Sequence, residues 1–380
     1  MIQHIREKSR EYFTKGIFKE KMYMSKPIDL NSILNEFILE SEISVYGNGH
    51  INDTYITNTK NYILQRINTG IFKNPDELMQ NIENVTNHIR LKMKALGRDE
   101  DRSTLTVVKT RKGESYVKCD DDHVYRVYKF INGSETIEKA ENDVHMYNAG
   151  KGFGEFQQML TDYPVDTLFD TIPNFHNTVK RVEALETAIK ENRTGRLIFV
   201  KDEVEFALSR AKDASVIVEG IEDGSIPLRV THNDTKINNI LFDDKTHEPL
   251  CVIDLDTVMQ GSLLYDFGDA MRIGASSAAE DEEDLSKVWF DEKLFEAFAK
   301  GFLEFMGEDI TPREKELLGF SAKLLTYECG IRFLTDYLNG DTYFKIHKPA
   351  HNLIRARNQF KLVKDIEDKM DKLNKIIENL

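Results

Sequence analysis

The sequence predicts an α+β protein with two lobes, a small antiparallel-sheet N-lobe and a mainly helical C-lobe. Three observations support this prediction. The chain has 380 residues, which is more than a single hydrophobic core normally organises. Apolar residues recur with the spacing of strands in residues 43–67 and again in residues 105–130. After Gly133 they recur mainly with the spacing of helices.

The first expected elements are a short helix and three strands. Residues 29–39 carry apolar side chains at helical spacing, and residues 43–67 then alternate in short runs separated by Gly-containing and polar turns. We therefore expect residues 1–40 to form a helical N-terminal extension. The strands would begin an N-lobe that covers residues 41–133.

The remaining elements follow from the same patterns. Residues 75–93 read as a helix with Pro75 in its first turn, and two more strands are expected at 105–109 and 123–130. Residues 134–380 would form the helical C-lobe, interrupted by two short strands between Asn239 and Asp254. The glycine-rich residues 150–154 lack the spacing of a phosphate-binding loop, and we expect an ordinary loop there.

Composition limits the class of protein. The net charge of −14 disfavours a nucleic-acid partner, because a phosphate backbone would be repelled. The 3 cysteines show no metal-ligand spacing, and no apolar run approaches the roughly 20 residues that span a bilayer. The first 21 residues do not resemble a signal peptide. We expect a cytoplasmic protein without a membrane partner, either a monomer or a weak homodimer.

The strongest chemical signal is the pattern H-x-D-x-K-x-x-N at residues 232–239. Phosphoryl transfer needs a carboxylate that orients the acceptor, a cation near the γ-phosphate and oxygen ligands for Mg²⁺. Asp234, Lys236 and Asn239 can supply these three groups. The alternative is that the polar residues of this stretch only cap turns, as Asp and Asn often do.

A second signal lies where the first requires it. Two apolar runs after Asn239 flank a polar turn, which predicts a hairpin that returns Asp254 to the neighbourhood of Asn239. A carboxylate at this place would hold the Mg²⁺ that bridges the β- and γ-phosphates.

These stretches resemble a known family. The runs 232–239 and 253–256, followed by Gly261 and residues 265–267, are similar to the signature of the aminoglycoside and choline kinase superfamily. Within it, residues 47–52, 231–236 and 327–334 resemble bacterial N-acetylhexosamine 1-kinases. The resemblance extends from about residue 45 to about residue 363.

The resemblance implies a protein-kinase-like fold that uses ATP and Mg²⁺ to phosphorylate the anomeric hydroxyl of N-acetylglucosamine or N-acetylgalactosamine. It makes Asp234 the catalytic base, and Asn239 and Asp254 the metal ligands. It also assigns a supporting role to Asp256 and a structural role to Asp266.

The nucleotide contacts are less defined. Gly47, Asn48 and Gly49 sit between two strands, where backbone N–H groups could approach phosphates, but an ordinary hairpin turn has the same pattern. The third strand of a kinase normally supplies a Lys that pairs with a Glu of the next helix. This strand has none, so Gln65 is the positional match and Arg66 the chemical alternative. Phe130 and Ile131 would form the hinge that pairs with adenine, or a plain linker.

Five residues are candidates for binding the acceptor. Glu328, Arg332 and Asp336 are spaced four apart and share one helical face, among apolar neighbours that predict a buried helix. Surface ion pairs, or an internal network around Arg332, would explain the same spacing. Tyr343 could add a stacking wall. His176 could reach the sugar or be a packing histidine.

Two other functions remain open at this stage. An aminoglycoside phosphotransferase would use the same catalytic loop on a cationic acceptor, which the acidic net charge permits but does not select. A non-catalytic nucleotide-binding scaffold is suggested by the missing strand Lys. The presence of Asp234, Asn239 and Asp254 argues against the scaffold.

Overall fold

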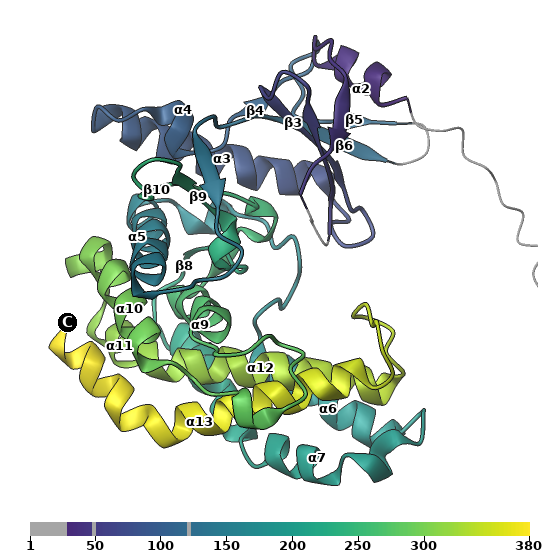
Figure 1. The fold of residues 1–380 in the computed structure, drawn as a ribbon, viewed down its shortest axis with the longest axis vertical. Coiled ribbons are helices and arrows are strands. Elements are labelled where there is room, and N and C mark those ends of the chain that lie inside the picture. Colours follow the sequence, from purple (N-terminus) through teal and green to yellow (C-terminus); the bar gives the residue numbers. More distant parts are fainter. Residues whose placement is uncertain (1–28, 48–50, 120–122) are drawn as a thin grey trace, which may run out of the picture.

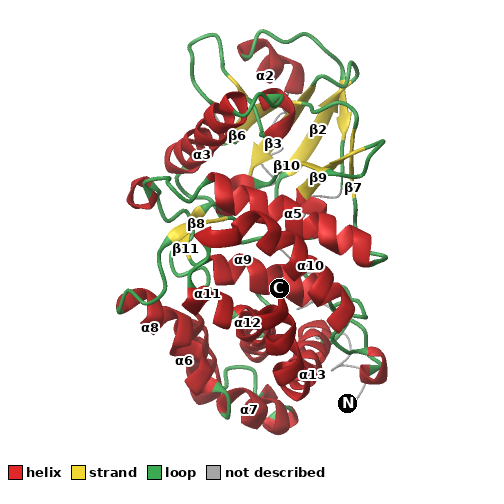
Figure 2. Ribbon diagram, turned by 90° about the vertical axis from the view of Figure 1, so that its left-hand side faces the viewer, coloured by secondary structure: helices red, strands yellow, loops and turns green. Residues whose placement is uncertain are grey.

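The structure is a computed structural model that describes residues 29–47, 51–119 and 123–380. Figure 1 shows two lobes, with the sheet-containing N-lobe at the top and the helical C-lobe below it. Figure 2 shows the same division by secondary structure, since most of the strands gather at one end. The predicted order of a small mixed lobe followed by a larger helical lobe is present.

The N-lobe contains, within the described residues, a six-stranded antiparallel sheet in which β1, β2, β3, β6 and β4 lie in that order and β5 also pairs with β6. The strands are β1 (Ile43–Val45), β2 (Asp53–Thr57), β3 (Tyr62–Ile67), β4 (Val107–Val108), β5 (Val117–Lys118) and β6 (Val124–Lys129). The three strands expected in residues 43–67 are all found. The strand expected at 105–109 is reduced to two residues.

Helices cover both faces of this sheet. Helix α2 (Leu30–Glu36) packs on the outer face, where Leu34 and Phe37 meet Leu64 of β3. Helix α3 (Pro75–Ala95) packs on the inner face, and it begins where the Asn74 side chain accepts a hydrogen bond from the backbone of its first turn. A short helix, α4 (Glu100–Ser103), follows. Side chains along β6 alternate between the two faces of the sheet, and those on the inner face point toward the C-lobe.

The C-lobe combines two small sheets with a set of helices. Strands β10, β9 and β7 form one sheet, and β11 and β8 form the other. The strands are β7 (Ser134–Thr136), β8 (Arg229–Thr231), β9 (Ile240–Asp243), β10 (Pro249–Val252) and β11 (Met259–Gly261). Only β9 and β10 were fully predicted, because strands of three residues are too short to show a period.

The helices of the C-lobe surround these sheets (Figure 2). They are α5 (Asp143–Met159), α6 (Thr178–Glu191), α7 (Lys201–Leu208), α8 (Val216–Glu222), α9 (Leu263–Gly274), α10 (Glu292–Met306), α11 (Pro312–Glu316), α12 (Leu318–Asn339) and α13 (His351–Asn379). Helix α12 is buried along most of its length. In the described ranges, no helix is both long and apolar enough to cross a membrane.

The glycine-rich residues 150–154 are helical, so the expected loop is wrong. They lie inside α5, where Gly150 and Gly154 face α10. A Cβ atom on Gly150 would come within 2.1 Å of the Phe298 carbonyl oxygen, and one on Gly301 of α10 would come equally close to the Tyr147 carbonyl oxygen. These glycines are there because the two helix backbones cross in close contact.

Candidate active site

The loop of residues 232–239 leaves β8 and is held by a buried carboxylate. The backbone N–H groups of His232 and Asn233 donate to the two oxygens of Asp266 at 2.8 and 2.7 Å. The Gln157 side chain donates to the same carboxylate at 2.6 Å. Burial raises the pKa of Asp266, and these donors oppose that rise. This geometry fits the structural role that the resemblance implied for Asp266.

Asp234 is surrounded by the other two residues of the motif. The ammonium of Lys236 lies 2.7 Å from Oδ1 and 3.1 Å from Oδ2 of Asp234. The Asn239 amide donates to the Asp234 backbone carbonyl at 2.8 Å and more weakly to Oδ2 at 3.3 Å. Burial lowers and the Asp234 carboxylate raises the pKa of Lys236, with a net rise. Lys236 therefore stays charged beside the carboxylate.

The predicted hairpin brings Asp254 to this loop. Strands β9 and β10 pair, and the Ile253 N–H donates to the Asn239 carbonyl at 2.9 Å, so the hairpin ends beside the catalytic loop. Asp254 has a positive φ of 59°, which is uncommon for a residue other than glycine. Its side chain is in contact with solvent, although neighbouring protein atoms partly desolvate it. Desolvation there, together with the charges of Asp256 and Asp234, raises the pKa of Asp254 to about 6.

The donor groups near Asp254 fit Mg²⁺. Within the described residues, the Asp254 carboxylate accepts no hydrogen bond, and Asn239 uses its amide nitrogen, which leaves the Oδ1 oxygen free. The described part of the chain holds no group of three His, Cys, Asp or Glu side chains placed to bind a metal. Mg²⁺ is commonly bound by one or two protein oxygens, with phosphates and waters as its other ligands. Asn239 and Asp254 match that requirement.

The predicted nucleotide contacts lie in the N-lobe, after β1, in β3 and after β6. Gly47 follows β1 with a positive φ of 71°, and a Cβ there would meet no atom within 4 Å. Asn48 and Gly49 lie outside the described residues. Phe130 and Ile131 follow β6, and the Phe130 ring packs edge-on against Tyr46. In the described ranges, neither the Phe130 carbonyl nor the Ile131 N–H takes part in a hydrogen bond, so either group is available to a base.

Gln65 and Arg66 point to opposite faces of β3. Arg66 forms an ion pair with Asp53 at a half-exposed position. Gln65 lies opposite Arg126 of β6, and its side-chain oxygen accepts from Nε and Nη2 of Arg126 at 3.1 and 2.9 Å. The sequence reasoning missed Arg126, whose side chain is only 1% exposed. A single Arg inside the otherwise apolar, aromatic run of β6 was the available signal.

Two of the predicted acceptor residues form a buried pair. His176 Nδ1 lies 2.9 Å from Glu328 Oε1, and the other Glu328 oxygen accepts from the Thr178 hydroxyl at 2.7 Å. Nε2 of His176 lies 3.3 Å from the Asn233 carbonyl, so the pair contacts the catalytic loop. Burial lowers and Glu328 raises the pKa of His176, with a net rise, while His176 helps to lower the pKa of Glu328. In this arrangement Glu328 orients His176, and His176 contacts the backbone of the catalytic loop at Asn233.

Arg332 and Tyr343 line a cavity of about 180 Å³ one helical turn farther along α12. Arg332 lies over the Phe175 and Phe344 rings, 6.0 and 5.6 Å from their centres, and forms no ion pair with any described residue. Among the described residues, the alternative of an internal ion-pair network around Arg332 is therefore not found. Tyr343 is 71% exposed at the edge of the cavity.

Arg181 of α6 lines the same cavity and was not predicted. Its Nη2 donates to the Phe175 carbonyl at 2.7 Å, whereas its buried Nε has no partner in the described structure. Asp336 also lines the cavity, but both of its oxygens are occupied. They accept from the backbone N–H groups of residues 342–344 and from the Asn352 amide. Two arginines without carboxylate partners thus dominate the charge of this cavity.

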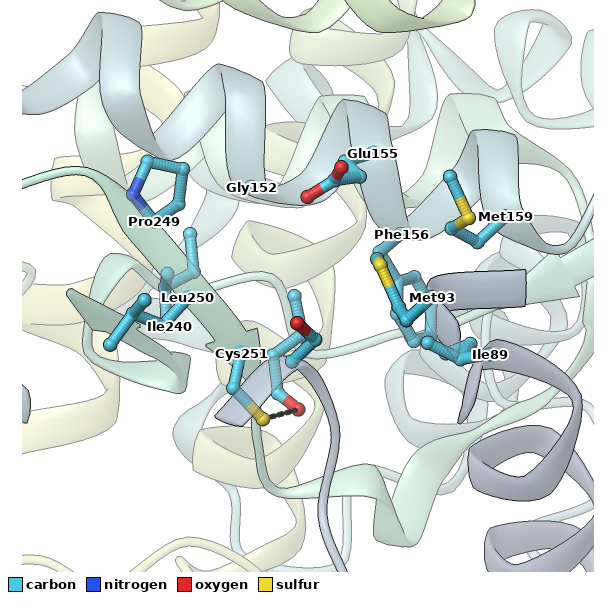
Figure 3. Close-up of a pocket in the computed structure, with 12 residues that line it drawn as sticks. Ile89, Met93, Gly152, Glu155, Phe156, Met159, Ile240, Pro249, Leu250 and Cys251 are labelled. Atoms are coloured by element: carbon cyan, nitrogen blue, oxygen red, sulfur yellow. Dashed lines mark hydrogen bonds between the residues drawn. The ribbon is translucent and has the colours of Figure 1, made fainter. Parts of the chain in front are cut away.

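A second, much smaller cavity lies at the junction of the lobes. Figure 3 shows Ile89 and Met93 of α3 facing Phe156 and Met159 of α5, with the β9–β10 hairpin completing the wall. Its volume is only about 20 Å³, roughly the space of one water molecule. We regard it as a packing gap between the lobes, because it cannot hold a sugar or a nucleotide.

Comparison with known proteins identifies the family. Residues 42–303 match the model of the phosphotransferase enzyme family abbreviated APH, so the chain belongs to that family. It is a phosphotransferase of that family, and the predicted protein-kinase-like fold is confirmed.

Solved structures show the same fold at low sequence identity. An aminoglycoside phosphotransferase from Alicyclobacillus acidocaldarius has a TM-score of 0.60 at 13% identity, covering 94% of this chain and 98% of that one. A microcompartment-associated aminopropanol kinase has a TM-score of 0.56 at 14% identity, covering 91% and 98%. An amicoumacin kinase solved with AMP-PNP and Ca²⁺ has a TM-score of 0.54 at 13% identity, covering 94% and 96%.

Proposed function

We propose that this kinase transfers the γ-phosphoryl group of ATP to the anomeric hydroxyl of an N-acetylhexosamine, with Mg²⁺ as cofactor. The observation that carries the transfer is the convergence of Asp234, Asn239 and Asp254. The hydrogen bond from the Ile253 N–H to the Asn239 carbonyl brings Asp254 beside the loop that carries Asp234 and Asn239. The complex of the amicoumacin kinase with AMP-PNP and Ca²⁺ supports a nucleotide and a divalent cation in such a site.

Each residue has a defined task in this reaction. Asp234 takes the proton of the acceptor hydroxyl, and the hydroxyl oxygen bonds to the γ-phosphorus. The bond from that phosphorus to the β–γ bridging oxygen breaks, which releases ADP. Lys236 lies beside Asp234 and supplies positive charge for the phosphoryl oxygens. Asn239 and Asp254 would hold Mg²⁺, which neutralises phosphate charge when it is bound. The peptide of Phe130 and Ile131 would pair with adenine.

The acceptor cavity favours a neutral sugar over a polyamine. The cavity lining carries the two cations Arg181 and Arg332 against the single carboxylate of Asp336, so an aminoglycoside with several ammonium groups would meet net positive charge. Guanidinium groups can donate to the hydroxyl and acetamido oxygens of an N-acetylhexosamine. Tyr343, at the edge of the cavity, can pack against a sugar ring. The resemblance of residues 327–334 to N-acetylhexosamine 1-kinases agrees with this choice.

An acceptor panel tests the proposal. ADP release from Mg·ATP is measured with N-acetylglucosamine, N-acetylgalactosamine, glucosamine, glucose and kanamycin, and Asp234→Asn gives the background of ATP hydrolysis. We expect turnover with the two N-acetylhexosamines, little with glucosamine and none with kanamycin. Turnover of kanamycin alone would overturn the substrate and leave the phosphoryl transfer intact.

A further inference from the structure

Arg126 and Asp256 form a buried ion pair that joins the two lobes. Arg126 lies on the inner face of β6 in the N-lobe, and its Nη1 is 2.5 Å from Oδ1 of Asp256 in the C-lobe. The side chains are 1% and 4% exposed. A second N-lobe residue, Asn52, donates to the other oxygen of Asp256 at 2.6 Å.

Kinases usually form an ion pair between a Lys of the third strand and a Glu of the next helix, but β3 of this chain contains no Lys. At the centre of β3 stands the neutral Gln65, which accepts from Arg126, and the acid Glu83 of α3 is instead paired with Lys109. The buried cation between the lobes therefore comes from β6. Its partner comes from the segment that follows the β9–β10 hairpin. Burial lowers and Asp256 raises the pKa of Arg126, with a net rise, so the guanidinium stays charged.

The side chain of Arg126 is almost completely enclosed by protein. Its remaining neighbours are the Met79 sulfur at 3.9 Å and the Tyr128 ring, whose centre is 5.1 Å away. The charge of Arg126 also acts on Asp254 through space, but its close contact in the C-lobe is with Asp256. Asp256 lies two residues after Asp254, within the short helical turn of residues 255–257. Asp254 immediately precedes that turn. An anchor on Asp256 therefore also restricts the backbone that carries the Asp254 carboxylate.

Stability alone does not account for the pair. Taking two charges out of water costs several kcal/mol each, and well-packed apolar residues often replace a buried ion pair without loss of stability. Groups that orient a metal ligand typically change metal affinity by about 10- to 100-fold when they are removed. Asp256 lies two residues after the proposed metal ligand Asp254 and is paired with Arg126 of the other lobe. This position suits a pair that orients a metal ligand.

We propose that Arg126 is a positioning residue, which anchors Asp256 to the nucleotide-binding sheet and thereby holds Asp254 in the orientation that binds Mg²⁺. The inference rests on the proposed use of ATP and Mg²⁺, and it is independent of the acceptor.

The test measures ATP affinity by calorimetry as Mg²⁺ is varied, without any acceptor. Arg126→Met keeps the bulk of the side chain and removes its charge. We expect the Mg²⁺ concentration that half-saturates ATP binding to rise at least about tenfold. ATP affinity without Mg²⁺ should change by less than about twofold, because the Arg126 side chain is almost fully buried and paired within the protein. Arg229→Met is the matched control, since Arg229 forms a buried pair with Glu314 inside the C-lobe and away from Asp254.

A double variant separates positioning from folding. Arg126→Met with Asp256→Leu removes both charges, so it leaves no unpaired buried ion and should recover thermal stability. The Mg²⁺ requirement should stay raised, because the anchor is still absent. Recovery of normal Mg²⁺ dependence in the double variant would overturn the inference, as would an unchanged requirement in Arg126→Met. A wild-type chain whose ATP affinity ignores Mg²⁺ would instead overturn the proposed function as well.

Discussion

Lys236 contacts both carboxylate oxygens of Asp234, at 2.7 and 3.1 Å, so one cation lies directly on the proposed base. During transfer the same cation can interact with the negative phosphoryl oxygens that approach Asp234. Its charge is then most useful in the transition state, where the transferring group lies between donor and acceptor.

Replacing Lys236 with Met should therefore lower kcat more than it weakens ATP binding. We expect a loss of about 10²- to 10³-fold in kcat, the size typical of removing one group that stabilises transition-state charge. Steady-state kinetics with ATP and the sugar measure this. Lys180→Met, which removes an exposed Lys paired with Glu183, should leave kcat unchanged. A Lys236→Met enzyme with normal kcat and a raised KM for ATP would assign Lys236 to ground-state binding alone.

Asp254→Asn should weaken ATP binding only in the presence of Mg²⁺. The variant keeps the shape of the side chain but removes the charged oxygen that we assign to the metal. We expect the half-saturating Mg²⁺ concentration to rise by more than the roughly 10- to 100-fold seen for a residue that only supports a ligand. Calorimetry with and without Mg²⁺ measures it. Asp243→Asn, at the end of β9 where Asp243 pairs with Arg102, is the control, and an equal effect there would contradict the assignment.

The His176–Glu328 pair should make stability depend on pH. Because the pKa of His176 is raised above its ordinary value of 6.5, its contribution is complete below that value and is lost as the pH rises through the raised pKa. Glu328, with a lowered pKa, loses its contribution only as the pH falls below its ordinary value of 4.5. His176→Gln should thus cost about 3 kcal/mol near the lower end of this window.

Thermal unfolding at about pH 6 and at an alkaline pH tests this, because loss of the His176 proton leaves the buried Glu328 carboxylate without a cationic partner. The difference between wild type and His176→Gln should shrink at the higher pH. The exposed His247, which pairs with Glu135, provides the control variant His247→Gln, for which we expect little effect at either pH. A constant difference across the range would show that His176 packs as a neutral side chain.

Arg332→Ala should raise the KM for the sugar, with little change in thermal stability or ATP affinity. Arg332 has no ion-pair partner in the described part of the chain, so its removal leaves no buried carboxylate unpaired. A lost hydrogen bond from a charged donor corresponds to about 1.5–3 kcal/mol, or roughly 10- to 150-fold in kcat/KM. Arg193→Ala, at an exposed position paired with Glu191, is the control. Loss of stability before loss of affinity would make Arg332 structural.

The sequence predicted those parts of the site whose residues are close along the chain. Asp234, Lys236 and Asn239 lie within one loop, and a hairpin of ordinary length returns Asp254 to it. Arg126 escaped prediction because its partner, Asp256, lies far along the chain and in the other lobe. Only the packing of the two lobes brings them together.

The fold prediction succeeded and failed for similar reasons. Long periodic segments such as α3 were found, whereas β7, β8 and β11 are three residues each and were mostly missed. Gly150 and Gly154 suggested a loop by local preference, but contact with α10 overrides that preference. Arg181 was missed because nothing in α6 reveals that it shares a cavity with Arg332 of α12.

The central claim is that Asp234 promotes transfer of the γ-phosphoryl group of ATP to the anomeric hydroxyl of an N-acetylhexosamine. The most direct measurement is ³¹P and ¹H NMR of the product formed from N-acetylglucosamine and Mg·ATP by wild type and by Asp234→Asn. We predict a sugar 1-phosphate, with phosphorus coupled to the anomeric proton, and a rate about 10²- to 10⁴-fold lower in the variant. A phosphate on any other hydroxyl, or full activity in Asp234→Asn, would contradict the account.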